Sequence, residues 1–187
     1  MKPPYVIWIT GLSAAGKTTV GNALVNSLKE AGVNVEQLDG DRLRKLFPKT
    51  GFSKKDRDSH IHRVGYLAGL LERNGVTVVA SLISPYKEAR TFVRSQCKQF
   101  IEVYLSTPLE ECEKRDPKGL YKKARKGEIT NMTGLTAPYE EPENPELIVD
   151  TSLMPVNKCV DQLIDFLIVS KIIFSNSPNG NFRLGNT

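Results

Sequence analysis

The residues with the most specific chemistry form one short run near the start of the chain. This run, Gly11-Leu12-Ser13-Ala14-Ala15-Gly16-Lys17-Thr18, has the spacing G-x-x-x-x-G-K-[ST]. Backbone N–H groups of such a loop converge on phosphate oxygens, and the positive end of the following helix adds to the attraction. The sequence therefore predicts a nucleoside triphosphate site in which Lys17 reaches the β- and γ-phosphates and the Thr18 hydroxyl holds Mg²⁺.

The segments on either side of this run are the ones that the motif requires. The apolar segment Tyr5–Thr10 predicts a strand directly before the loop. Thr19–Ala31 predicts a helix directly after it, with apolar residues every four positions: Val20, Leu24 and Leu28. A strand, a glycine loop and a helix in this order favour a phosphate site over a glycine-containing turn that binds nothing.

The rest of the chain alternates predicted strands with predicted helices. Four further strands are expected at Val33–Leu38, Val76–Ser81, Phe100–Leu105 and Leu147–Val149. Helices are expected at Arg42–Phe47, from the capping box Ser53-Lys54-Lys55-Asp56 to Asn74-Gly75, and at Tyr86–Gln96, Pro108–Arg115 and Val156–Val169. Strands that alternate with helices imply an α/β fold with a parallel sheet covered on both faces.

Length and composition fit one ordinary globular domain. The chain has 187 residues, a net charge of +5, 40% apolar residues and 25% charged residues, which suits polyanionic ligands such as nucleotides. Its three cysteines, Cys97, Cys112 and Cys159, lie far apart without a C-x-x-C pair, which favours a reducing compartment over disulfides or zinc. Because no signal peptide or membrane-spanning run is recognisable, we expect a cytoplasmic protein.

Asp41 is a candidate catalytic carboxylate. It follows the second predicted strand, at the sheet edge where ligands bind in α/β folds, and it could accept a proton from an attacking hydroxyl or hold a Mg²⁺-bound water. The alternative is helix capping, because Asp39 and Asp41 both precede a short helix. Since no carboxylate ends the third predicted strand, the balance favours a functional Asp41.

Two further groups could bind an anionic acceptor. Arg44, Arg57 and His60 have the charge and geometry for phosphate or sulfate, although a solvated helix surface is the alternative reading. Ser84 follows the third predicted strand, where it could touch a ligand or simply form a turn before Pro85.

A basic segment from Lys114 to Lys126 carries seven Lys or Arg residues and one acid. Such a run is either a solvated face or, in a phosphoryl-transfer enzyme, a mobile segment that closes over the phosphates. We expect a lid at about 114–138 within a single domain of residues 1–174, and a disordered tail at 175–187.

Several strings of the sequence resemble those of the adenylylsulfate kinase (APS kinase) family of P-loop kinases over residues from about 5 to 150. The matching strings are Gly11 to Thr19, Asp39-Gly40-Asp41-x-x-Arg44, Gly51-Phe52-Ser53, Ile83-Ser84-Pro85-Tyr86, Arg115-Asp116-Pro117-Lys118-Gly119-Leu120-Tyr121-Lys122-Lys123-Ala124-Arg125 and Pro138-Tyr139-Glu140-x-Pro142-Glu143. The resemblance implies a three-layer P-loop kinase fold: a five-stranded parallel sheet with helices on both faces and a basic lid. It also implies transfer of the γ-phosphoryl of MgATP to the 3′-hydroxyl of adenosine 5′-phosphosulfate (APS), giving PAPS.

The resemblance also implies roles for individual residues. ATP would be bound by Gly11, Leu12, Ser13, Ala14, Ala15, Gly16, Lys17, Thr18 and Thr19, with Mg²⁺ on Thr18. APS would be contacted by Asp41, Arg44, Phe52, Arg57, His60, Ile83, Ser84, Lys118, Asn131 and Met132, with Phe52 stacked on its adenine. The catalytic set would be Lys17, Asp41 and Ser84; Ser84 matches a serine sometimes assigned as a phosphorylated intermediate, and direct in-line transfer is the simpler route.

The sequence departs from the family pattern at a few positions. His60 and His62 replace Asn and Arg, Met132 replaces a Phe that packs on the acceptor adenine, and Ala14 replaces a Gly within the loop. These changes leave open a related kinase that acts on the sugar of another nucleotide anhydride. A second alternative is a non-catalytic nucleotide-binding regulatory module, although Lys17, Thr18, Asp41 and the full lid string count against it. We expect no nucleic-acid or membrane partner, and a homodimer is one assembly that the sequence allows.

Overall fold

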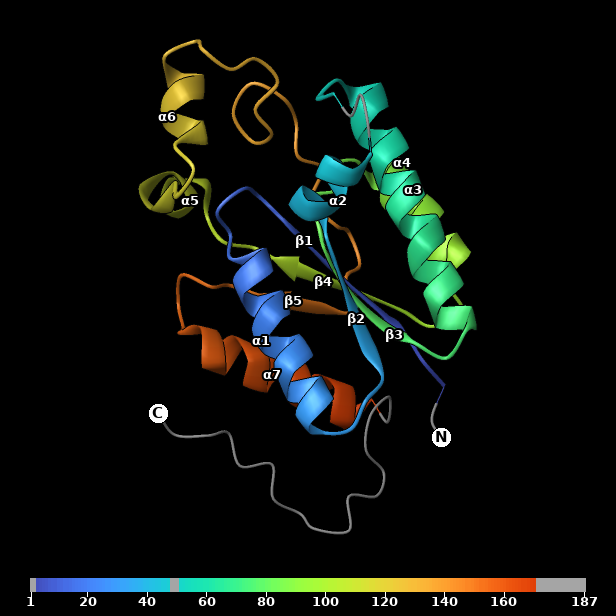
Figure 1. The fold of residues 1–187 in the computed structure, drawn as a ribbon. Coiled ribbons are helices and arrows are strands. Elements are labelled where there is room, and N and C mark those ends of the chain that lie inside the picture. Colours follow the sequence, from blue (N-terminus) through green and yellow to red (C-terminus); the bar gives the residue numbers. More distant parts are fainter. Residues whose placement is uncertain (1–2, 48–50, 171–187) are drawn as a thin grey trace.

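The computed structural model describes residues 3–47 and 51–170 as a sheet covered by helices on both faces (Figure 1). The strands are β1 (Val6–Gly11), β2 (Val35–Asp39), β3 (Thr77–Ser81), β4 (Phe100–Leu105) and β5 (Leu147–Val149). They lie in the order β2-β3-β1-β4-β5, and every pair of neighbours is parallel. The expected five-stranded parallel sheet is confirmed.

The helices form the outer layers and the carboxyl edge (Figure 1). Helices α1 (Lys17–Glu30) and α7 (Val156–Val169) cover one face of the sheet, and α3 (Lys54–Arg73) and α4 (Lys87–Gln96) cover the other. Three short helices, α2 (Gly40–Leu46), α5 (Leu109–Arg115) and α6 (Leu120–Arg125), lie beyond the ends of the strands. The loops that bind ligands in α/β folds are found at this edge.

The central strand β1 contributes to the cores on both faces. Ile7 and Ile9 pack with α1 and α7, whereas Val6 and Trp8 pack with α3 and α4, and all four are completely buried. Side chains alternate between the two faces of a strand, so a strand buried on both sides must be apolar throughout. Burial of these side chains fixes the end of β1, and with it the position of the loop that follows.

Most predicted boundaries are correct to within two residues, but the lid was incompletely predicted. Within the basic segment the chain forms α6, a helix that begins after Gly119 in a left-handed conformation (φ 64°) and has no side-chain cap. A six-residue helix without a cap leaves little signal in a sequence. The expected tail at 175–187 and the expected domain end at residue 174 lie outside the described residues.

Cys97, Cys112 and Cys159 are all free thiols. Within residues 3–47 and 51–170, no helix is both long and apolar enough to cross a membrane.

Candidate active site

The phosphate-binding loop depends on glycine at both ends. Gly11 has φ 151°, and a Cβ there would lie 2.7 Å from the carbonyl oxygen of Leu105. Gly16 has φ 94° and precedes the first turn of α1 without any side-chain cap. The N–H groups of that first turn have no intrahelical acceptor, so they remain available to phosphate oxygens. This geometry is the amide cradle that the motif predicts.

Ala14 adopts a left-handed conformation within the same loop, with φ 61°. A left-handed conformation costs an L-residue about 1 kcal/mol relative to glycine. The replacement of the usual glycine by alanine therefore matters here, because the loop demands a positive φ.

Lys17 points into the loop, where its Nζ donates a hydrogen bond of 2.6 Å to the carbonyl oxygen of Leu12. Burial lowers the pKa of the Lys17 ammonium to about 8, and the charge of Lys118 acts in the same direction. The carboxylates Asp41 and Asp39 act on the same ammonium in the opposite sense. Lys17, both aspartates and the lid lysine therefore share one electrostatic site.

Asp39, rather than Asp41, caps the short helix α2. One oxygen of Asp39 accepts from the N–H groups of Asp41 (3.1 Å) and Arg42 (3.0 Å), and the other accepts from the Thr18 hydroxyl at 2.9 Å. The capping alternative for Asp41 is therefore wrong. The sequence reading considered Asp39 only as a cap and missed its contact with Thr18.

Thr18 and Asp39 together offer the oxygen atoms that a phosphate-bound Mg²⁺ needs. Mg²⁺ prefers hard oxygen ligands, keeps several waters and is held at nucleotide sites by one or two protein groups plus the phosphates. Within the described residues, no group of three or more His, Cys, Asp or Glu side chains could hold a metal ion. The paired hydroxyl and carboxylate at the loop fit Mg²⁺ that arrives with the nucleotide.

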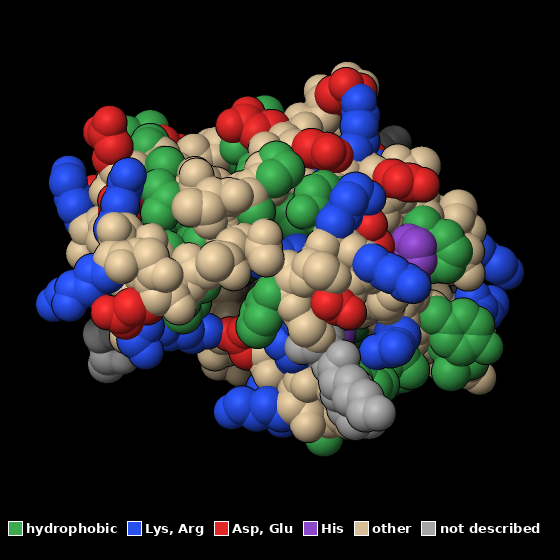
Figure 2. All heavy atoms as spheres, turned by 90° about the horizontal axis from the view of Figure 1, so that it is seen from above, with side chains coloured by type: hydrophobic (Ala, Val, Ile, Leu, Met, Phe, Trp, Pro, Cys, Tyr) green, Lys and Arg blue, Asp and Glu red, His purple; other side chains and the backbone are tan. Residues whose placement is uncertain are grey.

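The lid contacts the phosphate loop directly. Lys118 forms an ion pair with Asp41, and the Tyr121 hydroxyl donates to the carbonyl oxygen of Ser13 at 3.1 Å. A Cβ on Gly134, where the lid returns, would lie 2.6 Å from Leu12. Figure 2 shows Lys and Arg side chains on both flanks of the face that carries the lid and α2. The basic segment therefore packs against the phosphate loop and α2, and its role as a lid stays a prediction.

Arg44, Phe52 and Arg57 form one cluster beside the lid. The guanidinium of Arg44 lies 4.7 Å from the centre of the Phe52 ring, and that of Arg57 lies 5.6 Å from it. Buried Arg57 also donates to the carbonyl oxygens of Phe52 (2.9 Å) and Asn131 (2.6 Å). Because Arg57 is only 7% exposed, the alternative of a solvated helix surface is wrong for it. Arg57 therefore connects Phe52, the aromatic residue predicted to stack on the acceptor base, with Asn131 of the lid.

His60 lies one turn further along α3 and is also buried. Among residues 3–47 and 51–170, neither ring nitrogen has a hydrogen-bond partner that meets the usual geometry. Burial and, to a smaller extent, the nearby charge of Arg44 lower the pKa of His60 to about 4. His60 is therefore neutral near pH 7 and can offer a hydrogen bond but no charge.

Ser84 is buried and has a left-handed backbone conformation, with φ 39°. Its hydroxyl accepts from Trp8 Nε1 at 3.0 Å and donates to the Thr10 hydroxyl at 3.0 Å. Thr10 in turn donates to the carbonyl oxygen of Ile83 (2.6 Å) and lies 2.9 Å from the Tyr139 hydroxyl. Because this network occupies the Ser84 hydroxyl, its geometry suits a positioning role better than a covalent one.

The remaining predicted residues lie around the same edge. Met132, 6% exposed, packs into the core on the α1 side of the sheet, and its N–H donates to the Thr136 hydroxyl at 2.9 Å. Asn131 has φ 62°, and its carbonyl oxygen accepts the hydrogen bond from Arg57. Thr19 is exposed in the first turn of α1.

Two contacts beneath the loop were not foreseen. Arg115 donates to the Thr151 hydroxyl (2.7 Å) and carbonyl (2.8 Å), and the Thr151 hydroxyl donates to the Ala15 carbonyl at 2.9 Å. These bonds join the start of the lid, the turn after β5 and the phosphate loop. Thr151 and Ala15 are 136 positions apart, so no local pattern could have indicated the contact.

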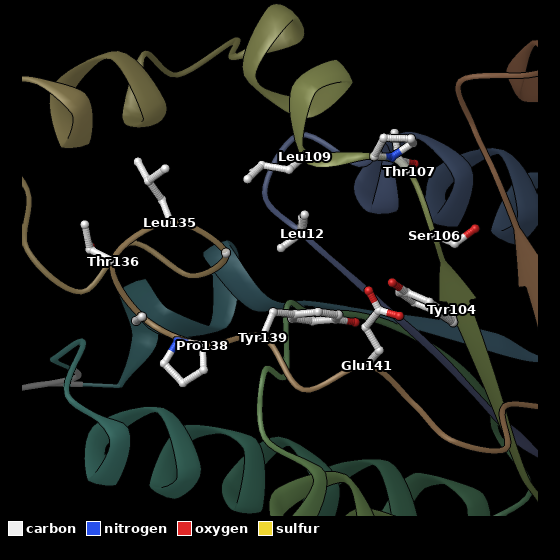
Figure 3. A pocket seen from close by; sticks show the side chains of 13 residues that line it. Leu12, Tyr104, Ser106, Thr107, Leu109, Leu135, Thr136, Pro138, Tyr139 and Glu141 are labelled. Carbon is white, nitrogen blue, oxygen red and sulfur yellow. The ribbon is translucent and has the colours of Figure 1, made fainter.

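A cavity of about 560 Å³ opens beside the phosphate loop. Leu12 and Leu109 lie across it from Tyr139 and Glu141, and the Tyr104 hydroxyl points toward Glu141 (Figure 3). The described residues that line this cavity include no Lys or Arg, so its lining offers no positive charge to a phosphate group. The loop amides around Lys17, next to the basic segment, stay the predicted phosphate site.

A family model described as adenylylsulphate kinase matches residues 3–150. The chain belongs to the adenylylsulphate kinase family. It is 50% identical over 159 residues to an adenylyl-sulfate kinase of Picosynechococcus, covering 84% of this chain and 90% of that protein. It is 53% identical over 148 residues to a probable adenylyl-sulfate kinase of Archaeoglobus fulgidus, covering 79% of this chain and 96% of that protein.

Solved structures of the adenylylsulphate kinase family share the fold. The Mycobacterium tuberculosis APS kinase CysC, solved in complex with AMPPNP and APS, matches with a TM-score of 0.85 and 39% identity, covering 90% of this chain and 99% of that one. The resemblance noted in the sequence, and the three-layer P-loop kinase fold that it implied, are thereby confirmed.

Proposed function

We infer that this chain is an ATP-dependent adenylylsulfate kinase, which transfers the γ-phosphoryl group of ATP to the 3′-hydroxyl of APS and produces PAPS. The sequence identity of 50–53% to adenylyl-sulfate kinases over most of the chain supports this function. The observation that carries it is the ion pair between Lys118 of the lid and Asp41. This pair joins the lid to α2, where Asp41 interacts electrostatically with both Lys17 of the phosphate loop and Arg44 of the cluster.

We assign the donor side to the loop and the first turn of α1. The loop amides and Lys17 would hold the triphosphate, and Thr18 and Asp39 would hold the Mg²⁺ that arrives with it. Mg²⁺ supplies charge neutralisation on the phosphate oxygens. Loose phosphoryl transfer needs positioning and charge neutralisation more than covalent chemistry, and the loop and Lys17 provide both.

We assign the acceptor side to α2, the start of α3 and the turn after β3. Asp41 accepts the proton of the attacking 3′-hydroxyl once Lys118 turns to the phosphates, because that movement frees the carboxylate. Arg44 and Lys118 face the anionic groups of the acceptor, and Phe52, 58% exposed, offers a ring to its base. Transfer is direct, because the buried Ser84 hydroxyl is engaged on both sides.

We place the protein in the cytoplasm, on the ground that all three cysteines are free thiols. A homodimer is the assembly proposed, and analytical ultracentrifugation tests it: a sedimentation mass of one chain contradicts it.

The decisive experiment is an ADP-release assay with a panel of acceptors: APS, and nucleotide anhydrides of cytidine and uridine. We expect turnover with APS, and product analysis should find the new phosphate on the 3′-oxygen. Faster turnover with a pyrimidine anhydride would identify a kinase for another acceptor, the alternative that Met132 leaves open. ATP binding without turnover on any acceptor would instead identify a regulatory module.

Two variants test the assignment of the loop and of the base. Lys17→Ala and Asp41→Ala should each lower kcat by about a hundredfold or more while the protein melts as a folded domain. Lys29→Ala, on the exposed side of α1, is the control and should retain full activity. Full kcat in Asp41→Ala would remove Asp41 from the mechanism.

A further inference from the structure

Arg90 is a buried cation outside the residues assigned so far. It lies in α4, its residue is 4% exposed, and all three of its nitrogens have partners. Nε lies 2.9 Å from Glu102 Oε1, Nη1 donates to the carbonyl oxygen of Ser84 at 2.7 Å, and Nη2 donates to that of Glu140 at 2.7 Å. Burying a charge is costly unless it is paired and hydrogen-bonded, so this full set of partners stabilises Arg90 where it lies.

The carbonyl of Ser84, the first of the two that Arg90 binds, lies in the turn after β3, which we assigned to the acceptor site. Ser84 has φ 39°, a conformation that strains any residue except glycine. Strained conformations persist only where surrounding contacts hold them. The charged hydrogen bond from Arg90 to the Ser84 carbonyl is such a contact, because it fixes the direction of the peptide that follows Ser84.

The carbonyl of Glu140, the second that Arg90 binds, lies in the segment that follows the lid. Glu140 is held at two further points, since its N–H donates to the Pro85 carbonyl (2.8 Å) and its carboxylate accepts from the Lys87 N–H (2.7 Å). The preceding residue, Tyr139, lies 2.9 Å from the hydroxyl of Thr10, which accepts from Ser84. The turn after β3 and the returning lid segment therefore meet at Arg90.

We propose that Arg90 is a positioning residue of the acceptor site, which sets the turn at Ser84 against the returning lid segment at Glu140. This inference rests on the proposed function, because it takes the turn at Ser84 to contact the acceptor. Arg90 acts through the backbone of these two residues and touches no substrate itself. Loosening it should weaken acceptor binding while leaving the ATP cradle intact.

Arg94 provides a matched control one turn further along α4. It pairs with the same Glu102 at 3.5 Å and with Glu146 at 2.6 Å, yet it is bonded to neither Ser84 nor Glu140. Lysine keeps the charge at either position but cannot reproduce the arginine fork. Lysine at position 90 could hold Glu102 only by giving up the two carbonyls.

The experiment compares steady-state kinetics of Arg90→Lys and Arg94→Lys, using whichever acceptor of the panel the wild type phosphorylates. We expect Arg90→Lys to raise KM for the acceptor by about tenfold or more, the effect of losing roughly 1.4 kcal/mol of binding, with KM for ATP changed less than about twofold. Arg94→Lys should change neither constant by more than about twofold. Equal effects of the two variants, or equal changes in both KM values of Arg90→Lys, would refute the proposal.

A measurement on the wild type covers the case in which Arg90→Lys does not fold. Hydrogen exchange should show that the acceptor protects residues 82–90 and 138–143 together, whereas an ATP analogue alone does not. Protection of residues 82–90 without 138–143 would contradict the coupling. A wild-type enzyme without turnover on any acceptor would refute the proposed function, whereas an active wild type with indistinguishable Arg90→Lys and Arg94→Lys would refute the role of Arg90 alone.

Discussion

ATP binding should be accompanied by proton uptake at Lys17. In the closed loop, burial lowers the pKa of this ammonium to about 8 from the ordinary 10.5. Keeping the ammonium charged there therefore costs about 3 kcal/mol, at roughly 1.4 kcal/mol per pKa unit. A triphosphate in the cradle brings several negative charges to within contact distance, which favours the charged form and returns the pKa toward its ordinary value.

The direction of the pH dependence follows from this shift. At about pH 8.5 roughly a quarter of the free protein carries a charged Lys17, so ATP binding should take up about 0.7 proton. At about pH 7 the lysine is already about 90% charged, and the uptake should fall to about 0.1 proton. ATP affinity should hence decrease as the pH rises above about 8. The free protein should become more stable between about pH 8 and 10.5, where only the unfolded chain retains the proton.

Titration calorimetry of MgATP without acceptor, in two buffers of different ionisation enthalpy, measures the proton uptake directly. Lys17→Arg is the matched control, because a guanidinium stays charged throughout and should take up no proton. A wild-type uptake below about 0.2 proton at pH 8.5, or an equal uptake in Lys17→Arg, would show that burial does not depress this pKa.

Three further substitutions test other parts of the site. Ala14→Gly should raise the free energy of unfolding by about 0.5–1 kcal/mol in denaturant titrations, because it relieves the φ of 61°; a loss of stability would contradict the strain. Asp39→Asn should preserve the cap of α2 and the melting temperature, yet raise the Mg²⁺ concentration needed for half-maximal rate by about tenfold; an unchanged Mg²⁺ requirement would separate Asp39 from the metal. Met132→Phe should lower KM for the acceptor by a few-fold, because an aromatic ring stacks on a base better than methionine does; since Met132 is 6% exposed, an unchanged or raised KM would show that it serves the core instead.

The sequence predicted the features that depend on neighbouring residues. The strand, loop and helix around Lys17 follow from apolar spacing and glycine placement within about 30 residues, and the capping box at Ser53 and Asp56 is present at the start of α3. The strings shared with adenylylsulfate kinases assigned Asp41 and Lys118 to one predicted acceptor site, and the structure brings these two side chains together. The lid contacts the loop, and Lys118 reaches Asp41.

Features created by distant residues could not be predicted in the same way. Arg57 and Asn131 are 74 positions apart in the sequence. No sequence periodicity indicates that a buried arginine donates to a carbonyl oxygen of another loop. Asp39 was read as a cap, because its second partner, Thr18, lies on a different element. The conformation of Ala14 was likewise open, since only the closed loop requires its positive φ.

The position of β1 in the middle of the sheet affects how the protein forms during synthesis. This first strand has β3 and β4 as its neighbours, residues 77–81 and 100–105, and every pairing is parallel. Until the ribosome has released about a hundred residues, β1 lacks β4, and the loop after Gly11 lacks its hydrogen bonds to Tyr121 and Thr151. Nucleotide can therefore stabilise a nascent chain only late in translation, and a chain truncated before β4 should have no affinity for ATP.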